Sequence, residues 1–314
     1  GNSATCSADQ TVRIDKTAPT CTTSGGSSSW YNTNRTITGT CSDTGGSGCV
    51  GNISYTYSVS SGSSLSITNG GPGANGTAGT VSDAAGNTAQ CSADQTVKID
   101  KVLPAATAHN PTSRGWGNTN ISIALSSTDT HSGIASYQYC STTNGTQCTP
   151  STSGGTVSLT STGQYTVCSR AKDNAGNTGE TTCSAANAYK IDKTAPAATA
   201  HQPTSRDWGN TNISITISAT DANSGTASYQ YCTTTNGSTC TPSTAGNTVS
   251  LTSEGQYTVC SRAIDTAGNT GDTTCSASNA YKIDKTAPTC TKSGGSTSWY
   301  NTNRTITGTC SDTG

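Results

Sequence analysis

Cysteine is the most reactive residue type in this sequence, and its number and spacing indicate disulfide bonds. The 314 residues contain 15 cysteines, and no two of them stand in a Cys-x-x-Cys pair. Zinc sites usually draw on such closely spaced pairs, whereas cysteines at this density in an oxidising compartment form disulfides. The sequence therefore predicts a disulfide-stapled protein, with zinc as the less favoured alternative.

Aspartates recur at three kinds of position and are candidate ligands for a hard cation. One set stands at the junctions between the repeats described below: Asp15, Asp100, Asp192 and Asp284. A second set begins Gly-containing loops, and a third begins hairpin turns: Asp43, Asp129 and Asp221, then Asp83, Asp173 and Asp265. Ca²⁺ binds several such oxygens, but Asp also caps turns through its own backbone. Turn capping is favoured, because no loop has the dense acidic spacing of a dedicated calcium loop. We therefore predict no cofactor, with calcium at the four junction aspartates as the alternative.

Residues for acid–base or nucleophilic catalysis are few. His109 and His201 occupy equivalent positions in two repeats, and Glu180 and Glu254 are the only glutamates. No set of nucleophile, base and orienting group repeats, and paired-carboxylate chemistry is poorly supplied. We expect a protein that is not an enzyme.

Internal repetition divides the sequence into units, and the strands of these units must position the residues named above. The tripeptide Ile-Asp-Lys begins at Ile14, Ile99, Ile191 and Ile283, at intervals of 85, 92 and 92 residues. Each interval has the size of a small domain. The predicted units are the tail of a preceding type A unit (1–14), a type A domain (15–99), two type B domains (100–191 and 192–283) and the N-terminal part of a further type A unit (284–314).

Within the repeats, apolar and polar residues alternate in short segments such as 36–40, 121–123 and 213–217. A period of two places one face of a strand in the core and the other in water. Such segments, about seven per repeat and separated by Gly, Asn and Asp, are typical of an immunoglobulin-like sandwich. No segment has helical periodicity. The predicted fold class is all-β, with tandem immunoglobulin-like β-sandwich domains.

Four cysteines fall in each complete repeat, which leads to a pairing scheme. A turn centred between Ala175 and Gly176 would place Cys168 opposite Cys183, and the second B repeat has the same symmetry. Cysteines eight residues apart close short loops, and the remaining type A pair joins the first strand to the last. The predicted disulfides are Cys21–Cys91, Cys41–Cys49, Cys140–Cys148, Cys168–Cys183, Cys232–Cys240 and Cys260–Cys275.

Pairing across the repeat junction is the alternative, with Cys6 bonded to Cys21. It would leave Cys91 single, because Ala106 stands at the position equivalent to Cys21 in the next repeat. Pairing within repeats leaves Cys6, Cys290 and Cys310, which we expect to be single because they lie in incomplete units.

Charge and composition exclude some partners. The formal net charge is −1 and 11% of residues are charged, so nucleic acid and anionic lipid are not expected partners. No apolar run is long enough to span a bilayer. Phe and Met are absent, and a small apolar core would gain about 3 to 5 kcal/mol from each disulfide.

The junction segment 14–21, the segment 83–87 and the loop 41–49 resemble bacterial Ig-like repeats of the Asp-Lys-Thr-Ala-Pro type in large cell-surface proteins and adhesins. The resemblance implies an extracellular or cell-surface location and a structural or adhesive role. Proline at positions 19, 196 and 288 restricts the chain just after three of the junctions. We therefore expect the domains to follow one another end to end as a stiff rod.

Two functions follow as hypotheses. The favoured one is a structural repeat segment of an extracellular bacterial surface filament or stalk that self-associates or assembles with neighbouring copies. The alternative is an adhesin repeat array that binds a surface glycan or protein and is stiffened by calcium. Tryptophan recurs once per repeat, at Trp30, Trp116, Trp208 and Trp299. It would suit sugar stacking, although a lid over the sandwich edge is favoured.

Overall fold

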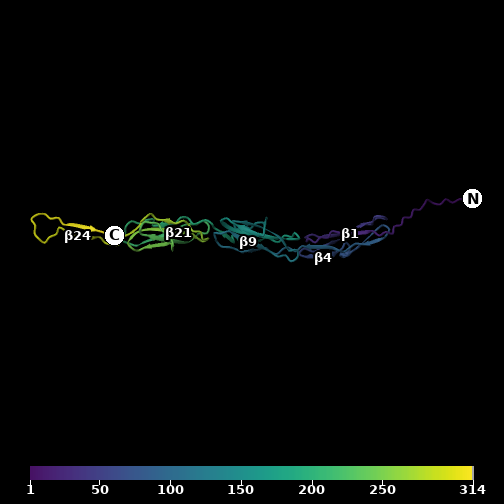
Figure 1. Ribbon diagram of the computed structural model, residues 1–314, viewed down its shortest axis with the longest axis horizontal. Coiled ribbons are helices and arrows are strands. Elements are labelled where there is room, and N and C mark those ends of the chain that lie inside the picture. The colour runs from purple at the N-terminus through teal and green to yellow at the C-terminus, as the bar shows by residue number, and fades with distance from the viewer. Residues whose placement is uncertain (313–314) are drawn as a thin grey trace. The chain divides into compact units, whose positions relative to one another are not determined.

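The computed structural model describes residues 1–312, and strands dominate its ribbon (Figure 1). The described residues form 25 strands and one short 3₁₀ turn, η1 (Ala74–Gly76). The chain divides into two compact units, and the division runs through the first B repeat. The first unit comprises residues 1–112, 122–157 and 166–186, and the second comprises 113–121, 158–165 and 187–314. Tandem β-sandwich domains are thus the observed fold class, as the alternating sequence predicts.

The A repeat lies in the first unit and contains three small antiparallel sheets. Their strand orders are β1-β2-β3, β4-β7 and β5-β6. The strand bounds are β1 Thr20–Ser24, β2 Arg35–Ser42, β3 Ile53–Tyr57, β4 Ser64–Gly70, β5 Thr80–Ser82, β6 Thr88–Gln90 and β7 Gln95–Asp100. Ile37 of β2 and Ile99 of β7 are fully buried and share a core cluster with Tyr57 and Val97.

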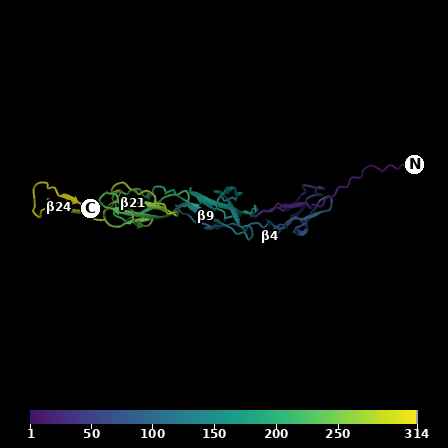
Figure 2. The same cartoon turned by 45° about the vertical axis from the view of Figure 1, so that its right-hand side comes forward.

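Each B repeat has two sheets with the same topology in both copies. The first copy has the orders β12-β9-β8 and β11-β10-β13-β14, with β15 pairing to β13. Its strand bounds are β8 Ala108–Asn110, β9 Ile121–Ser126, β10 Ile134–Thr142, β11 Thr152–Ser153, β12 Thr156–Leu159, β13 Gly163–Asp173, β14 Thr182–Cys183 and β15 Tyr189–Ile191. Figure 2 gives a second view of the ribbon, with β9 labelled in this repeat.

The second B copy lies wholly in the second unit. Its strand bounds are β16 Ala200–Gln202, β17 Ile213–Ser218, β18 Thr226–Thr234, β19 Thr244–Ala245, β20 Thr248–Leu251, β21 Gly255–Asp265, β22 Thr274–Cys275 and β23 Tyr281–Ile283. Strand β17 alternates fully between buried and exposed residues, because Ile occupies every second position. Its three isoleucines pack in one cluster with residues of β20, β21 and β23, so the two sheets enclose a single core.

The described residues contain seven disulfides. Six of them join the pairs expected from the sequence: Cys21–Cys91, Cys41–Cys49, Cys140–Cys148, Cys168–Cys183, Cys232–Cys240 and Cys260–Cys275. The predicted hairpin symmetry is present in the ladder, where Cys168 of β13 lies opposite Cys183 of β14. Cys6 is exposed and free.

The seventh disulfide corrects one expectation, because Cys290 and Cys310 are bonded to each other rather than single. They lie opposite each other in the ladder between β24 (Thr289–Ser293) and β25 (Thr307–Ser311). The A repeat places Cys21 opposite Cys41 in the same way, but there each bonds to another cysteine. Between β24 and β25 the facing positions bring the two sulfurs within bonding reach of each other.

Candidate cation site at the repeat junctions

Three consecutive residues tie the A repeat to the first B repeat, and they face alternate sides of the junction. Ile99 is fully buried in the core of the A repeat. Asp100 turns toward the B repeat, where its Oδ2 accepts a hydrogen bond from the backbone N–H of Ser132 at 3.0 Å. Lys101 turns back, and its Nζ donates to Asn34 Oδ1 at 2.9 Å and to the backbone oxygen of Val59 at 2.9 Å. The Ile-Asp-Lys motif therefore holds both sides of the junction.

The junction between the two B repeats uses the same contacts. Asp192 is fully buried, and its Oδ2 accepts from the backbone N–H of Ser224 at 3.0 Å. Lys193 Nζ returns to Asn120 Oδ1 and to the backbone oxygen of Thr160, both at 2.6 Å. Two junctions with different flanking residues thus reach the same geometry, which makes it a property of the motif.

At three of the four junctions, aspartates from three separate segments converge. One comes from the junction motif, one from the loop that follows the second strand of the new repeat and one from the hairpin turn. One carboxylate oxygen from each of the three lies within 4.8 Å of the other two. The three aspartate triads are Asp15/Asp43/Asp83, Asp100/Asp129/Asp173 and Asp192/Asp221/Asp265.

The loop aspartate is held by its own backbone. Asp129 Oδ1 accepts from the backbone N–H groups of His131, Ser132 and Gly133 at 3.2, 2.9 and 2.9 Å. Its other oxygen, Oδ2, is shielded from solvent and has no hydrogen-bond partner, and Asp221 Oδ2 in the next repeat is the same. Turn capping thus accounts for one oxygen of each loop aspartate and leaves the other without a partner.

The turn aspartate is fixed by the hairpin that follows β13. Asp173 Oδ1 accepts from the backbone N–H groups of Gly176 and Asn177, both at 2.7 Å. Gly176 has a φ of 99°, which favours glycine at this position of the turn. Asn177 Nδ2 donates both to Asp173 Oδ2 at 2.7 Å and to the backbone oxygen of Asp100 at 2.9 Å. The amide therefore holds the turn against the junction.

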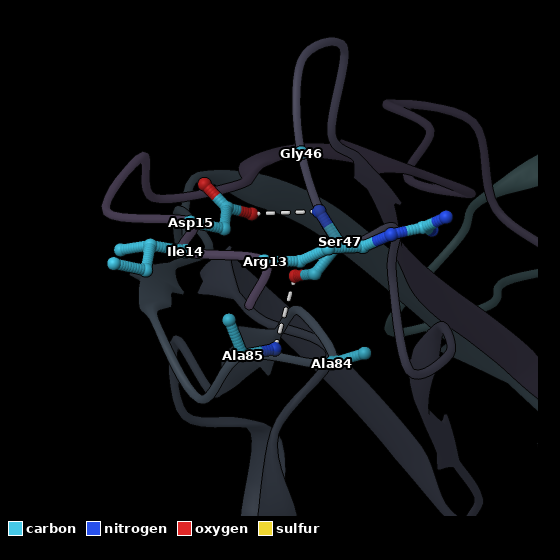
Figure 3. Close-up of a pocket in the computed structure, with 7 residues that line it drawn as sticks. All are labelled: Arg13, Ile14, Asp15, Gly46, Ser47, Ala84 and Ala85. Carbon is cyan, nitrogen blue, oxygen red and sulfur yellow. Dashed lines mark hydrogen bonds between the residues drawn. The ribbon is translucent and has the colours of Figure 1, made fainter. Parts of the chain in front are cut away.

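The triad of the A repeat is more open and lies beside a pocket of about 440 Å³ (Figure 3). Figure 3 shows Asp15 facing Ser47, whose backbone N–H donates to Asp15 Oδ2 at 2.7 Å. The backbone approaches closely because position 46 is glycine, and a Cβ there would overlap the Asp15 carboxylate. Asp15 and Asp43 are half-buried, and only Asp83 is buried.

Hydrogen bonding favours the charged carboxylate at two junctions. The backbone N–H groups of Thr17 and Ser47 lower the pKa of Asp15 from its usual value. Burial pushes the pKa of Asp192 upward, but hydrogen bonds from Ser224 and Thr194 outweigh it, so the net shift is downward. None of the nine triad aspartates forms a salt bridge within residues 1–312. Each triad therefore concentrates negative charge without a salt bridge to offset it within the described residues.

The structure brings together three of the four junction aspartates with their loop and turn counterparts. The fourth, Asp284, belongs to no triad among the described residues, and its Oδ1 accepts from the backbone N–H of Thr286 at 2.9 Å. Sequence reasoning singled out all nine aspartates but did not predict that they converge. The signal was available, because the three kinds of position recur in the same order in every complete repeat.

Two sulfur clusters have the proximity of a metal site but different chemistry. The sulfurs of Cys140, Cys148 and Cys168 lie close together, as do those of Cys232, Cys240 and Cys260. All six sulfurs are in disulfides. Because metals bind the thiolate, these clusters serve as cross-links.

The two equivalent histidines pair with buried serines in the sandwich interior. His109 Nε2 lies 2.7 Å from Ser169 Oγ, and His201 Nε2 lies 2.7 Å from Ser261 Oγ. Both serines are fully buried, so a substrate cannot reach their hydroxyls in this conformation. Burial lowers the pKa of both histidines. This hydrogen bond joins β8 to β13 in the first B repeat and β16 to β21 in the second.

Fold and junctions together define an all-β, disulfide-stapled protein of tandem repeats. No family model matches the chain, and no curated protein matches it. Among solved structures, it is similar to the fibronectin(III)-like modules of CbhA from Clostridium thermocellum, at 15% identity and a TM-score of 0.28. The match covers 56% of this chain and 92% of the CbhA chain. The described residues contain no helix long and apolar enough to cross a membrane.

Proposed function

We propose that this chain is a structural repeat segment of an extracellular bacterial surface filament or stalk. The observation that carries the proposal is the Ile-Asp-Lys junction, in which adjacent residues bond to the repeats on both sides. A flexible tether would not need such contacts, because a linker that only connects domains can remain solvated. Junctions of this kind suit a spacer that resists bending.

The cross-links support an extracellular location. Seven disulfides in one chain require an oxidising compartment, since cytosolic reductants keep thiols reduced. They also suit a protein exposed to harsh conditions, because a covalent link limits how far a domain can open.

Neighbouring copies of the chain are the proposed partners. The two B repeats have the same strand order, and such closely similar units suit assembly with further copies of the same chain.

The stalk function predicts that the junctions limit bending. The test inserts Gly-Ser-Gly-Ser between Lys193 and Thr194 of the full chain, which separates the two halves of the junction. The matched control places the same insert after Asn144, in an exposed loop of the first B repeat. End-to-end distances would be measured by single-molecule fluorescence on dyes at the two termini.

We expect a narrow distance distribution for the unmodified chain and the loop control, and a clearly broader one for the junction insert. If the unmodified chain already shows the broad distribution, the junctions do not stiffen it and the stalk function is wrong.

An adhesive function is the second candidate, and one observation favours it. Trp208 is 50% exposed. Trp116 at the equivalent position is less exposed and has Lys190 Nζ 5.8 Å from its ring centroid. An exposed indole can stack on a sugar ring. A glycan-binding screen of the full chain tests this function, with Trp208→Ala as the variant. Binding that Trp208→Ala abolishes would support adhesion, and no binding to any glycan would oppose it.

A further inference from the structure

Three cysteines of the second B repeat stand in one row across three neighbouring strands. Cys260 of β21 lies opposite Cys232 of β18 on one side and opposite Cys275 of β22 on the other. Cys260 is bonded to Cys275, and Cys232 is bonded to Cys240. The first B repeat has the same register and the same two bonds at its equivalent cysteines. The row is therefore a repeated feature of the fold.

The two disulfides of this row are close enough to exchange. The sulfurs of Cys232, Cys240 and Cys260 lie within 4.8 Å of one another. In exchange, a thiolate bonds to one sulfur of a disulfide and displaces the other. A bond between Cys232 and Cys260 would need no change of register. Facing residues of antiparallel strands are about 4.5 to 5.5 Å apart at Cα, and disulfides usually span about 4.4 to 6.8 Å.

One end of the row is open to a small molecule. A pocket of about 540 Å³ is lined by residues of β16 and β22, and Cys275 is one of them. These strands are edge strands of the two sheets, so the pocket lies at the open side of the sandwich. Cys275 is half-buried, whereas Cys260 is fully buried. A dissolved thiol therefore reaches this disulfide at Cys275 and not at Cys260.

We propose that this pocket is a site of S-thiolation, at which a low-molecular-weight thiol bonds to Cys275 and starts an exchange relay along the row. The incoming thiol gives its proton to water and bonds to Cys275 Sγ, and the Cys260 sulfur leaves as a thiolate. Cys260 then bonds to Cys232 Sγ, and the bond between Cys232 and Cys240 breaks. The Cys240 thiolate takes a proton from water. Two disulfides break and two form, so the relay needs no oxidant.

Burial gives the second step of the relay its direction. A thiolate at Cys260 would be fully buried, and a buried charge without a partner is costly. The relay moves the thiol to Cys240, which is half-buried and follows the exposed residues 238 and 239. A reaction at one edge of the sandwich thus opens the loop 232–240 and leaves a thiol at its end. The inference does not depend on the stalk function, because the products can be mapped whatever the chain does.

The first test maps the products of exchange on the full folded chain. Every protein carries Cys6→Ser, because Cys6 is free and exposed and would itself attack disulfides. The chain is incubated with reduced glutathione at about pH 8, where thiolates are populated, and without oxygen. Thiols are then blocked with N-ethylmaleimide, and unreduced peptides are identified by mass spectrometry. We expect glutathione on Cys275, a bond between Cys232 and Cys260, and N-ethylmaleimide on Cys240.

Three results of this mapping would overturn the proposal. Glutathione on Cys275 with N-ethylmaleimide on Cys260 would show that the disulfide opens without a relay. Glutathione on Cys232 or Cys240 before any appears on Cys275 would place the entry point at the other disulfide. A chain that takes up no glutathione at Cys275 would show that the pocket does not admit a thiol.

The second test removes the disulfide that receives the exchange. In the double variant Cys232→Ala, Cys240→Ala, the Cys260 thiolate can only attack Cys275 again and expel glutathione, so glutathione on Cys275 should fall several-fold. The matched control Cys41→Ala, Cys49→Ala removes a disulfide of the A repeat with the same separation of 8 residues, and it should leave this labelling unchanged. Equal labelling in both double variants would contradict the relay. Should the first variant fail to fold, the product map decides the question alone.

Discussion

At the residue scale, the most informative side chains are polar groups that the fold has buried. His109 and His201 each lie against a buried serine and are less than a tenth exposed. Burial disfavours the charged imidazolium and lowers the pKa of both residues from 6.5. The unfolded chain therefore binds more protons than the folded chain as the pH falls below 6.5. The contribution of the two histidines to folding stability should be fully present above this pH and should be lost as the pH falls below it.

The corresponding prediction concerns the double variant His109→Gln, His201→Gln. The unmodified chain should lose stability as the pH falls from 7.5 to about 5. The double variant should lose clearly less over the same range, because Gln does not titrate. Urea denaturation at several pH values would measure this, with the exposed Thr204→Ala as the control. Equal pH dependence in all three proteins would show that the two histidines do not couple folding to protonation.

At the element scale, strand register determines which cysteines can meet but not always which ones bond. Cys168 of β13 lies opposite both Cys140 of β10 and Cys183 of β14. It bonds to Cys183, while Cys140 bonds to Cys148. The A repeat shows the same ambiguity, since Cys21 faces Cys41 but bonds to Cys91. Register alone leaves Cys168 with two facing partners and would pair Cys21 with Cys41. Hairpin symmetry and the count of cysteines per repeat were needed to choose the bonded partners.

Removing disulfides from the A repeat should destabilise it more when the disulfide closes the longer loop, with a logarithmic dependence on loop length. Cys21 and Cys91 are 70 residues apart, and Cys41 and Cys49 are 8 apart. The chain-entropy model predicts a loss of about 4 kcal/mol for Cys21→Ala, Cys91→Ala and about 2.5 kcal/mol for Cys41→Ala, Cys49→Ala. Urea unfolding of the two double variants beside the unmodified chain measures both losses. A larger loss from the short loop would mean that native packing, not chain entropy, sets the value.

At the scale of the whole molecule, the repeated junction is the feature that makes the domains into an array. One buried isoleucine, one aspartate and one lysine occupy consecutive positions and contact alternating sides of the junction. The same three contacts recur at both complete junctions. An array built in this way repeats the same junction contacts from one repeat to the next.

Lys193→Met tests the returning contact of the junction. The substitution keeps an unbranched side chain but removes the donors to Asn120 and Thr160. Because the lysine is exposed, we expect a loss of at most about 1 kcal/mol in unfolding free energy. Backbone amides at 193–195 should exchange hydrogen several-fold faster. The control is Lys172→Met, which replaces an exposed lysine of the first B repeat. Equal exchange in the two variants would show that Lys193 does not secure the junction.

The sequence by itself determined the strands, the repeat intervals and six of the seven cysteine pairs, because these depend on patterns that are local or recur at a constant period. Ile213, Ile215 and Ile217 alternate with polar residues, and β17 follows directly from that alternation. The tertiary structure alone decided that Asp100, Asp129 and Asp173 meet. They are tens of residues apart, and nothing in a linear pattern states which ends of which strands lie together. Only the pairing of two sheets around one core brings a loop, a turn and a junction to the same end of a domain.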